Sequence, residues 1–219
     1  MIKGILLDID NTLYNYNLAH QAGLNAVFSF IDKIFKKEDF IKAFETARNQ
    51  IHNELKNTAS SHNRILYFQR TLELLKYDDI LMVKKLYDIY WDNFLENIKL
   101  FDGVTEFLEK NDKKICFFTD LTADIQYRKL EKTGLFKYSS YIVTSEEAGV
   151  EKPNKKMFNL ALRKLELSAD EVCIIGDSWE RDIVGALELN IKPYWKTTEK
   201  SEDERVSVFN DFRELIGKI

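Results

Sequence analysis

The chain has 219 residues, of which 32 are basic and 36 acidic, and its formal net charge is −4. Apolar residues make up 45% of it, which excludes a wholly disordered chain, and the acidic excess argues against a general nucleic-acid binder. No segment approaches the roughly 18 apolar residues of a membrane-spanning helix. The two cysteines, Cys116 and Cys173, lie in apolar runs, so we expect buried thiols in a reducing cytoplasm and no disulfide framework.

The first element in chain order is a short apolar run, residues 2–9, which ends in acidic residues and is typical of a buried strand in a parallel sheet. A helical stretch follows over residues 17–97, with no proline and a single glycine. Within it, apolar residues recur at spacings of three and four and predict one buried helix face: Phe40, Ala43, Phe44, Ala47, Ile51 and Leu55. We expect this stretch to be an inserted cap domain.

From residue 104 onward, predicted helices and strands alternate. The expected strands are 114–119, 141–144, 171–175 and 191–195, and the expected helices are 104–109, 123–132, 154–165, 180–189 and a closing 209–216. Such alternation is typical of right-handed crossovers in a parallel sheet. The sequence therefore predicts an α/β fold: a Rossmann-like core domain formed by residues 1–16 and 98–219, and an α-helical cap domain formed by residues 17–97.

Acidic side chains stand at the ends of two of the predicted strands, where ligands bind in open parallel sheets. Asp8 and Asp10 follow the first strand, Asp177 follows the strand 171–175, and Asp182 lies one helical turn further on. Carboxylates that meet in a small space repel one another, and a bound Mg²⁺, which prefers oxygen ligands, relieves that repulsion. The pattern predicts a metal site at this edge of the sheet.

Two further groups at the strand ends suit a phosphate. Thr119 ends the second strand, and Lys152 follows the third. A hydroxyl, an ammonium group and backbone N–H groups at turns are suitable partners for phosphate oxygens. Beside a carboxylate nucleophile and a metal ion, these residue types predict phosphoryl chemistry.

Four segments taken together resemble the haloacid dehalogenase (HAD) superfamily, specifically its phosphatases with a helical cap inserted after the first motif. They are Leu6–Thr12 as the apolar run with DxDxT, Phe117–Thr119 as the strand ending in Thr, Lys152–Pro153, and Gly176–Asp182 as GDSxxxD. Any one motif is weak, but all four occur in order at strand ends. Residues 145–158 are also similar to nucleoside 5′-monophosphate phosphatases and sugar-phosphate phosphatases of this superfamily.

The resemblance implies a role for each matching residue. Asp8 would attack phosphorus and form an aspartyl-phosphate, while Asp10 would donate a proton to the leaving group and then act as base toward water. The side chains of Asp8 and Asp177 and the backbone carbonyl of Asp10 would hold Mg²⁺. Thr119 and Lys152 would bind the phosphoryl oxygens and contribute to catalysis. The residues implied in supporting roles are Thr12, Ser178 and Asp182.

The chain departs from the family pattern at two positions. Asp120 stands beside the predicted phosphate site, where many relatives carry Asn, and we count it among the substrate-binding residues. An extra anion there weakens phosphate binding unless the carboxylate meets a cation. Arg181, at a position where Asn is common, is a candidate for that cation.

These observations lead us to expect a Mg²⁺-dependent hydrolase that dephosphorylates a small phosphorylated metabolite, a nucleoside monophosphate first and a sugar phosphate second. The alternatives are a phosphomutase of the β-phosphoglucomutase type and a non-catalytic binding module. A haloacid dehalogenase needs neither a proton donor nor a metal, so Asp10 and Asp177 argue against it. We expect no nucleic-acid or membrane partner, a cytoplasmic location, and a monomer or homodimer. The physiological substrate is not readable from the cap sequence.

Overall fold

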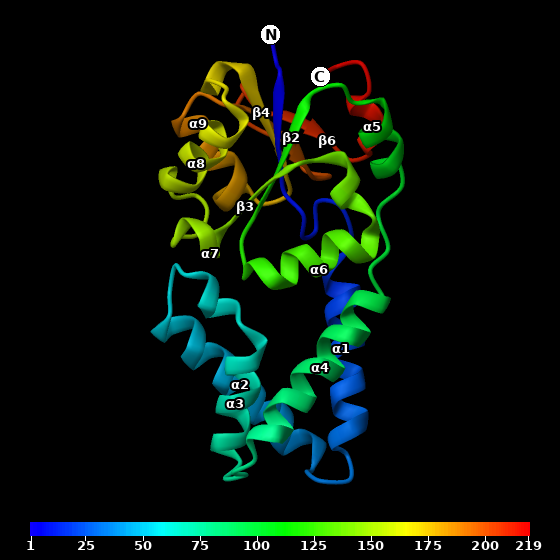
Figure 1. Cartoon of the computed structure of the whole chain (residues 1–219), viewed down its shortest axis with the longest axis vertical. Coiled ribbons are helices and arrows are strands. Elements are labelled where there is room, and N and C mark those ends of the chain that lie inside the picture. The colour runs from blue at the N-terminus through cyan, green and yellow to red at the C-terminus, as the bar shows by residue number, and fades with distance from the viewer. The chain divides into compact units, whose positions relative to one another are not determined.

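The computed structural model describes all residues from Met1 to Ile219. The chain folds into two compact units. The core unit comprises Met1–Asn15 and Lys99–Ile219, and the helical unit comprises Tyr16–Ile98. The helical unit thus follows the first strand in the sequence and precedes the rest of the core (Figure 1).

The core unit is built on a six-stranded sheet with the order β3-β2-β1-β4-β5-β6. Every neighbouring pair of strands is parallel, so the predicted parallel α/β fold is confirmed. The strands are β1 (Gly4–Leu7), β2 (Lys114–Thr119), β3 (Tyr141–Thr144), β4 (Val172–Gly176), β5 (Lys192–Lys196) and β6 (Ser207–Phe209).

Helices cover both faces of this sheet, and Figure 1 shows α8 and α9 on one side of the strands and α5 on the other. The apolar runs of β1 and β4 are therefore buried along their whole length, as in parallel sheets generally. Cys116 and Cys173 are free and buried in β2 and β4. The helices of the core are α5 (Val104–Lys110), α6 (Ala123–Thr133), α7 (Ser145–Ala148), α8 (Lys155–Leu165) and α9 (Val184–Glu188), with short 3₁₀ turns η2 (Leu135–Tyr138) and η3 (Ala169–Glu171).

Two of the predicted helices differ in the structure. The expected closing helix 209–216 is instead the end of β6 followed by a single 3₁₀ turn, η5 (Phe212–Leu215), because Asp211 caps a new start there and Gly217 takes a positive φ of 76° just beyond. The expected helix 180–189 begins as a wide π-helical turn, η4 (Trp179–Ile183), before continuing as α9. The N–H of Ile183 donates to the carbonyl of Ser178, five residues back, at 3.3 Å, which widens this turn.

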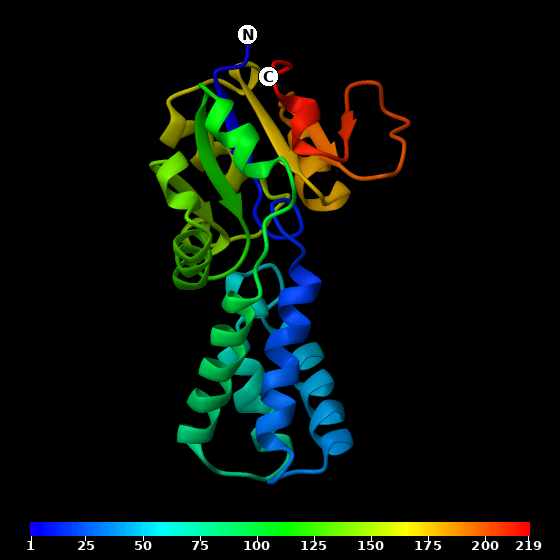
Figure 2. The same ribbon diagram turned by 90° about the vertical axis from the view of Figure 1, so that its right-hand side faces the viewer.

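The helical unit consists of α1 (Tyr16–Ile31), α2 (Lys37–Glu54), η1 (Ala59–His62), α3 (Arg64–Leu74) and α4 (Ile80–Glu96). α1 packs along α4 and α2 along α3 (Figure 2). The buried residues of α2 belong to the predicted face, from Phe40 to Ile51. A Cβ atom on Gly23 of α1 would lie 2.8 Å from the ring of Tyr90 on α4, so glycine allows this close helix contact. None of the helices in the structure combines the length and the apolar character needed to cross a membrane.

Candidate active site

The strand order brings three chain segments that are far apart in the sequence to one edge of the sheet. β1 lies between β2 and β4, and Leu7 pairs with Phe117 on one side and with Ile175 on the other. Because the strands are parallel and in this register, the residues that follow them emerge together at the carboxyl edge. Asp8 therefore lies between Thr119 at the end of β2 and Asp177 just after β4.

Three carboxylates converge at this edge. Asp8, Asp177 and Asp182 each offer an oxygen, and these oxygens lie within 4.8 Å of one another. The hydroxyl of Thr12, which is fully buried, lies 2.7 Å from Oδ2 of Asp8 and 3.2 Å from Oδ1 of Asp177. A hydroxyl has one proton, so Thr12 donates to one carboxylate at a time and links the two.

One buried lysine opposes these acids. Nζ of Lys152 lies 2.7 Å from Oδ1 of Asp8 and 2.7 Å from Oδ1 of Asp182, and all three side chains are buried. Burial alone lowers the pKa of Lys152, but the charges of Asp182 and Asp8 outweigh it and raise the pKa above its usual range. The ammonium group is therefore a fixed positive charge beside Asp8.

A single lysine does not neutralise three carboxylates. Burial, followed by the charge of Asp8, raises the pKa of Asp177 to about 6. Burial also raises the pKa of Asp182 to about 7, against the opposing charge of Lys152. Clustered oxygen donors with excess negative charge are the donor set that Mg²⁺ prefers, so Asp8, Asp177 and Asp182 fit a divalent cation.

The turn after β4 is what aims Asp182 back at the sheet. The backbone N–H of Ser178 donates to Oδ2 of Asp182 at 3.1 Å, and the Ser178 hydroxyl accepts from the N–H of Arg181 at 3.3 Å. A Cβ atom on Gly176 would stand 2.3 Å from Oδ2 of Asp182. Only glycine leaves room for the carboxylate there, which explains the GDSxxxD spacing physically.

Asp120 forms an ion pair with Arg181, the cation that the sequence suggested for it. Its Oδ1 accepts from the backbone N–H of Lys152 at 3.0 Å, and its Oδ2 pairs with Nη1 of Arg181 at 3.0 Å. Burial raises the pKa of Asp120, while the charges of Lys152 and Arg181 oppose that rise. The two departures from the family pattern, Asp120 and Arg181, thus compensate each other within this chain.

Asp10 is held by side chains that the sequence did not single out as partners. Nζ of Lys129 lies 2.7 and 2.8 Å from its two carboxylate oxygens, Nε2 of Gln126 donates at 3.2 Å, and the hydroxyl of Tyr14 also donates to it. Burial alone would raise the pKa of Asp10, but the charge of Lys129 and these hydrogen bonds lower it. Gln126 also donates to the hydroxyl of Thr119 at 2.9 Å, which ties Thr119 to Asp10.

A signal for Lys129 and Gln126 was present in the sequence. The buried residues of α6 are Ile125, Gln126, Lys129 and Leu130, which is one helix face at spacings of three and four. Two polar residues on an otherwise buried face need buried partners, and a lysine there requires an anion. The acidic residues predicted at the strand ends could supply that anion, but the sequence alone does not show which of them pairs with Lys129.

The structure brings all the predicted site residues into two connected networks. The first holds Asp8, Thr12, Lys152, Asp177 and Asp182, with Ser178 contributing through its backbone. The second holds Asp10, Thr119 and Asp120 through Gln126, whose Nε2 also lies 2.8 Å from the carbonyl of Asp120. The amide has two N–H donors, so they are shared among these three acceptors. Asp120 joins the two networks at Lys152.

The site thus combines a parallel α/β core with clustered carboxylates and a buried lysine at the strand ends. Residues 5–217 match the haloacid dehalogenase-like hydrolases, so the chain belongs to this family. The predicted superfamily and enzyme class are thereby confirmed.

Several relatives of the chain are named as phosphatases. The chain is 38% identical over 196 residues to ribulose-1,5-bisphosphate 5-phosphatase from Halopiger xanaduensis, covering 85% of this chain and 81% of that protein. It is 30% identical over 191 residues to glyceraldehyde 3-phosphate phosphatase from Methanopyrus kandleri, covering 85% and 80%. It is 27% identical over 226 residues to pyrimidine 5′-nucleotidase YjjG from Escherichia coli, covering 98% and 97%.

Solved structures share the fold over nearly the whole chain. The putative HAD-hydrolase YfnB from Bacillus subtilis, described bound to magnesium, has a TM-score of 0.74 at 23% identity, with 98% of this chain and 96% of that chain covered. The 2-haloacid dehalogenase from Pseudomonas syringae pv. Tomato has a TM-score of 0.77 at 21% identity, with the same coverage. These similarities concern the fold alone.

Proposed function

We propose that the protein is a Mg²⁺-dependent phosphatase that hydrolyses a small phosphomonoester through an aspartyl-phosphate intermediate. The observation that carries the proposal is the meeting of Asp8, Asp177 and Asp182 around Lys152 and Thr12. Phosphoryl transfer needs a nucleophile, positive charge on the phosphoryl oxygens and control of one proton. This cluster offers the first two, and Asp10 offers the third.

In this proposal an oxygen of Asp8 attacks phosphorus, and the bond from phosphorus to the alcohol oxygen breaks. Asp10 donates a proton to that oxygen, then takes a proton from the water that cleaves the aspartyl-phosphate. Lys152 and Thr119 hold phosphoryl oxygens. The side chains of Asp8 and Asp177 and the backbone carbonyl of Asp10 would hold Mg²⁺, which supplies further positive charge for the phosphate.

Lys129 affects the two half-reactions differently. Its ammonium group keeps Asp10 ionised, since it lowers the pKa of that carboxyl group. The ionised form is the one that accepts a proton from water in the second half-reaction. To donate a proton in the first half-reaction, Asp10 must be protonated, which requires the contact with Lys129 to loosen.

We propose a phosphorylated sugar as the substrate class, ahead of a nucleoside monophosphate. The relatives that are at least 30% identical are named for ribulose-1,5-bisphosphate and glyceraldehyde 3-phosphate, whereas the nucleotidase is 27% identical. The sequence motifs had favoured a nucleoside monophosphate over a sugar phosphate, so the ranking of the two substrate classes is now reversed. We further propose a cytoplasmic enzyme, because Cys116 and Cys173 are buried free thiols, with the helical unit as a cap that selects the substrate.

The test is the release of inorganic phosphate from a panel of sugar phosphates and nucleoside monophosphates, with and without Mg²⁺. We expect turnover that needs Mg²⁺ and falls at least 1,000-fold (an order-of-magnitude figure) in Asp8→Asn, since an amide is no nucleophile. Asp112→Asn is the matched control, because Asp112 is exposed and pairs only with its neighbour Lys113. No phosphate release by folded protein, or full activity of Asp8→Asn, contradicts the proposal. An isomerised hexose phosphate as product would indicate a phosphomutase instead.

A further inference from the structure

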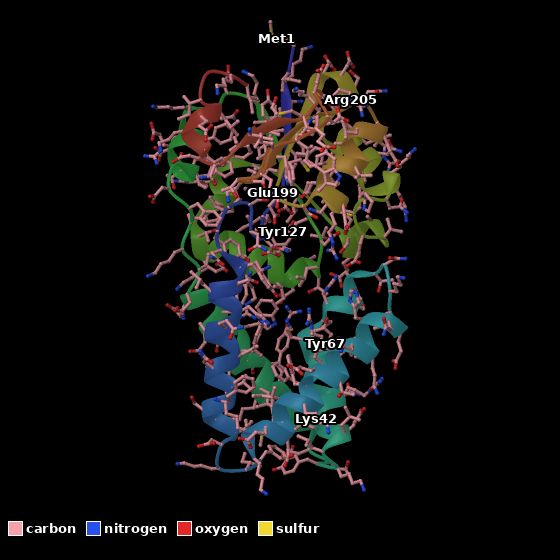
Figure 3. All side chains as sticks on the ribbon, turned by 180° about the vertical axis from the view of Figure 1, so that it is seen from behind. Met1, Lys42, Tyr67, Tyr127, Glu199 and Arg205 are labelled. Atoms are coloured by element: carbon pink, nitrogen blue, oxygen red, sulfur yellow. The ribbon has the colours of Figure 1, made fainter.

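Gln126 lies in the middle of the second network of the candidate active site, although it takes no part in the proposed chemical steps. It belongs to α6 and is fully buried, whereas the next residue, Tyr127, is 58% exposed and is labelled in Figure 3. Gln126 and its partners Asp10, Thr119 and Asp120 are all part of the core unit. A buried amide among these residues needs a physical explanation.

The amide nitrogen of Gln126 is surrounded by acceptors. Its Nε2 lies 2.8 Å from the carbonyl oxygen of Asp120, 2.9 Å from the hydroxyl oxygen of Thr119 and 3.2 Å from Oδ2 of Asp10. A carbonyl and a carboxylate accept hydrogen bonds and do not donate them. The amide therefore has one favourable orientation, because the flipped amide would place its oxygen against these acceptors.

This orientation leaves the other end of the amide without a partner. Oε1 of Gln126 is buried and accepts no hydrogen bond. A buried acceptor without a partner lowers the stability of a folded protein, so each one needs a reason. A residue that lowers stability in this way is expected at a functional site, where local rules are broken for the sake of the chemistry.

The orientation of Gln126 also sets the direction of the hydrogen bonds at Thr119. Because the Thr119 hydroxyl oxygen accepts from Gln126, its single proton is left for a different acceptor. In the structure that acceptor is the carbonyl of Asp120, 3.2 Å away, which also has the shorter contact of 2.8 Å with Gln126. The carbonyl of Asp120 therefore keeps a partner when the proton of Thr119 turns to another acceptor.

We propose that Gln126 is a positioning residue, which holds the hydroxyl of Thr119 as a hydrogen-bond donor toward a phosphoryl oxygen. An ionised phosphoryl oxygen is an acceptor, so a hydroxyl binds it by donating its proton. The inference deepens the proposed function and rests on it for the identity of the anion. Gln126 acts through Thr119 and needs no contact of its own with the phosphate.

The test measures phosphate binding, which requires no turnover. Isothermal titration in Mg²⁺ gives the Kd of inorganic phosphate, the product of the proposed reaction. In Gln126→Met the hydroxyl of Thr119 is no longer oriented, so we expect the Kd to rise about tenfold, as for one hydrogen bond to a charged group. The variant also removes the unpaired Oε1, while Asp10 keeps its contact with Lys129, so its free energy of unfolding in urea should not fall.

A double-mutant cycle separates positioning from packing. Thr119→Val removes the hydroxyl and keeps the shape, and it should raise the Kd at least as much as Gln126→Met does. If Gln126 acts through Thr119, then adding Gln126→Met to Thr119→Val raises the Kd by less than about twofold. Gln126→Asn keeps an amide that is one methylene shorter, so it tests the same contact where Gln126→Met does not fold. Gln69→Met is the matched control, because Gln69 is exposed, donates to Glu73 at 2.9 Å and should leave the Kd unchanged.

The outcomes decide the inference separately from the proposed function. The inference is wrong if the wild-type protein binds no phosphate in Mg²⁺, or if folded Gln126→Met and Gln126→Asn bind it as tightly as the wild type. It is also wrong if Gln126→Met weakens binding equally with and without the hydroxyl of Thr119. If phosphate binding depends on Gln126 through Thr119 while the wild-type protein hydrolyses no phosphomonoester, the positioning role stands and the proposed phosphatase function fails.

Discussion

Lys129 is the residue that sets the charge state of Asp10, and we expect its effect to appear in the pH dependence of catalysis. In Lys129→Met, burial is no longer opposed by the ammonium charge, so the pKa of Asp10 rises. The pH limb of kcat that reports ionisation of Asp10 then moves to higher pH, and kcat falls about 10- to 100-fold as Asp10 loses its position. A pH–rate profile from about pH 3 to pH 9 measures both effects, because the wild-type limb lies below the ordinary pKa of 3.8 for an aspartate.

Two comparisons make this result interpretable. Lys129→Arg keeps the charge next to Asp10 and should retain most of the wild-type pH profile. Lys132→Met is the control for loss of a lysine from the same helix, because Lys132 is exposed, and it should leave the pH profile unchanged. A lower kcat with an unmoved pH limb in Lys129→Met would mean that Lys129 supports only the packing of α6.

The turn from β4 into η4 depends on one glycine. In Gly176→Ala, the new methyl group would lie 2.3 Å from Oδ2 of Asp182, so the carboxylate must leave its contact with Lys152. We expect a loss of about 1–3 kcal/mol in the free energy of unfolding, as for other overpacked sites, and at least a 100-fold loss of kcat. Urea denaturation and phosphate release measure the two quantities.

Gly134→Ala is a suitable control for this substitution. Its Cβ would meet nothing within 4 Å, but its φ of 69° strains a side chain, so stability should fall by about 1 kcal/mol while kcat stays unchanged. Unchanged kcat in Gly176→Ala would show that the position of Asp182 does not matter for the reaction.

Elements with a strong local signal could be predicted from the sequence. β1, β2 and β4 are apolar runs with a polar residue at the end or directly after it: Asp8, Thr119 and Asp177. Gly134 ends α6 in the left-handed conformation expected of a C-cap. Because parallel strands share a carboxyl edge, these runs predicted that Asp8 and Asp177 lie at the same edge of the sheet. The pairing of β1 with β4, which makes the two residues neighbours, is seen only in the structure.

Elements that depend on distant partners could not be predicted. β6 has three residues and exists through pairing with β5, where Trp195 lies opposite Val208. The wide turn η4 forms because Asp182 and Ile183 both donate their N–H groups to the carbonyl of Ser178. The pairing of Asp120 with Arg181, 61 positions apart, and the position of Arg64 beside Tyr16 and Tyr90 follow from tertiary packing, which no local pattern encodes.

At the scale of the whole molecule, the core unit buries more carboxylates than cations, whereas the buried charged residue of the helical unit is Arg64. This difference affects how each unit responds to acid. In the metal-free core unit, the pKa values of Asp177 and Asp182 are raised to about 6 and about 7 by burial and neighbouring carboxylates. The folded core then binds more protons than the unfolded chain between about pH 4 and 7. Its stability should therefore increase as the pH falls through that range, and Mg²⁺ should restore stability at pH 7.

The helical unit should show the opposite response, because the pKa of His20 is lowered to about 4 by burial and by Arg64 and Arg48. Below its ordinary pKa of about 6.5 the unfolded chain gains a proton that folded His20 does not, so stability is lost as the pH falls from 6.5 to 4. Allowing for the partial exposure of His20, we expect the free energy of unfolding to fall by about 2 kcal/mol over this pH range. Hydrogen exchange in EDTA, corrected for its intrinsic pH dependence, measures the stability of each unit separately from its own peptides. In His20→Gln, the stability of the helical unit should no longer fall with pH in this range, while the response of the core unit should stay unchanged. If both units weaken together on acidification, the buried charges do not act as described.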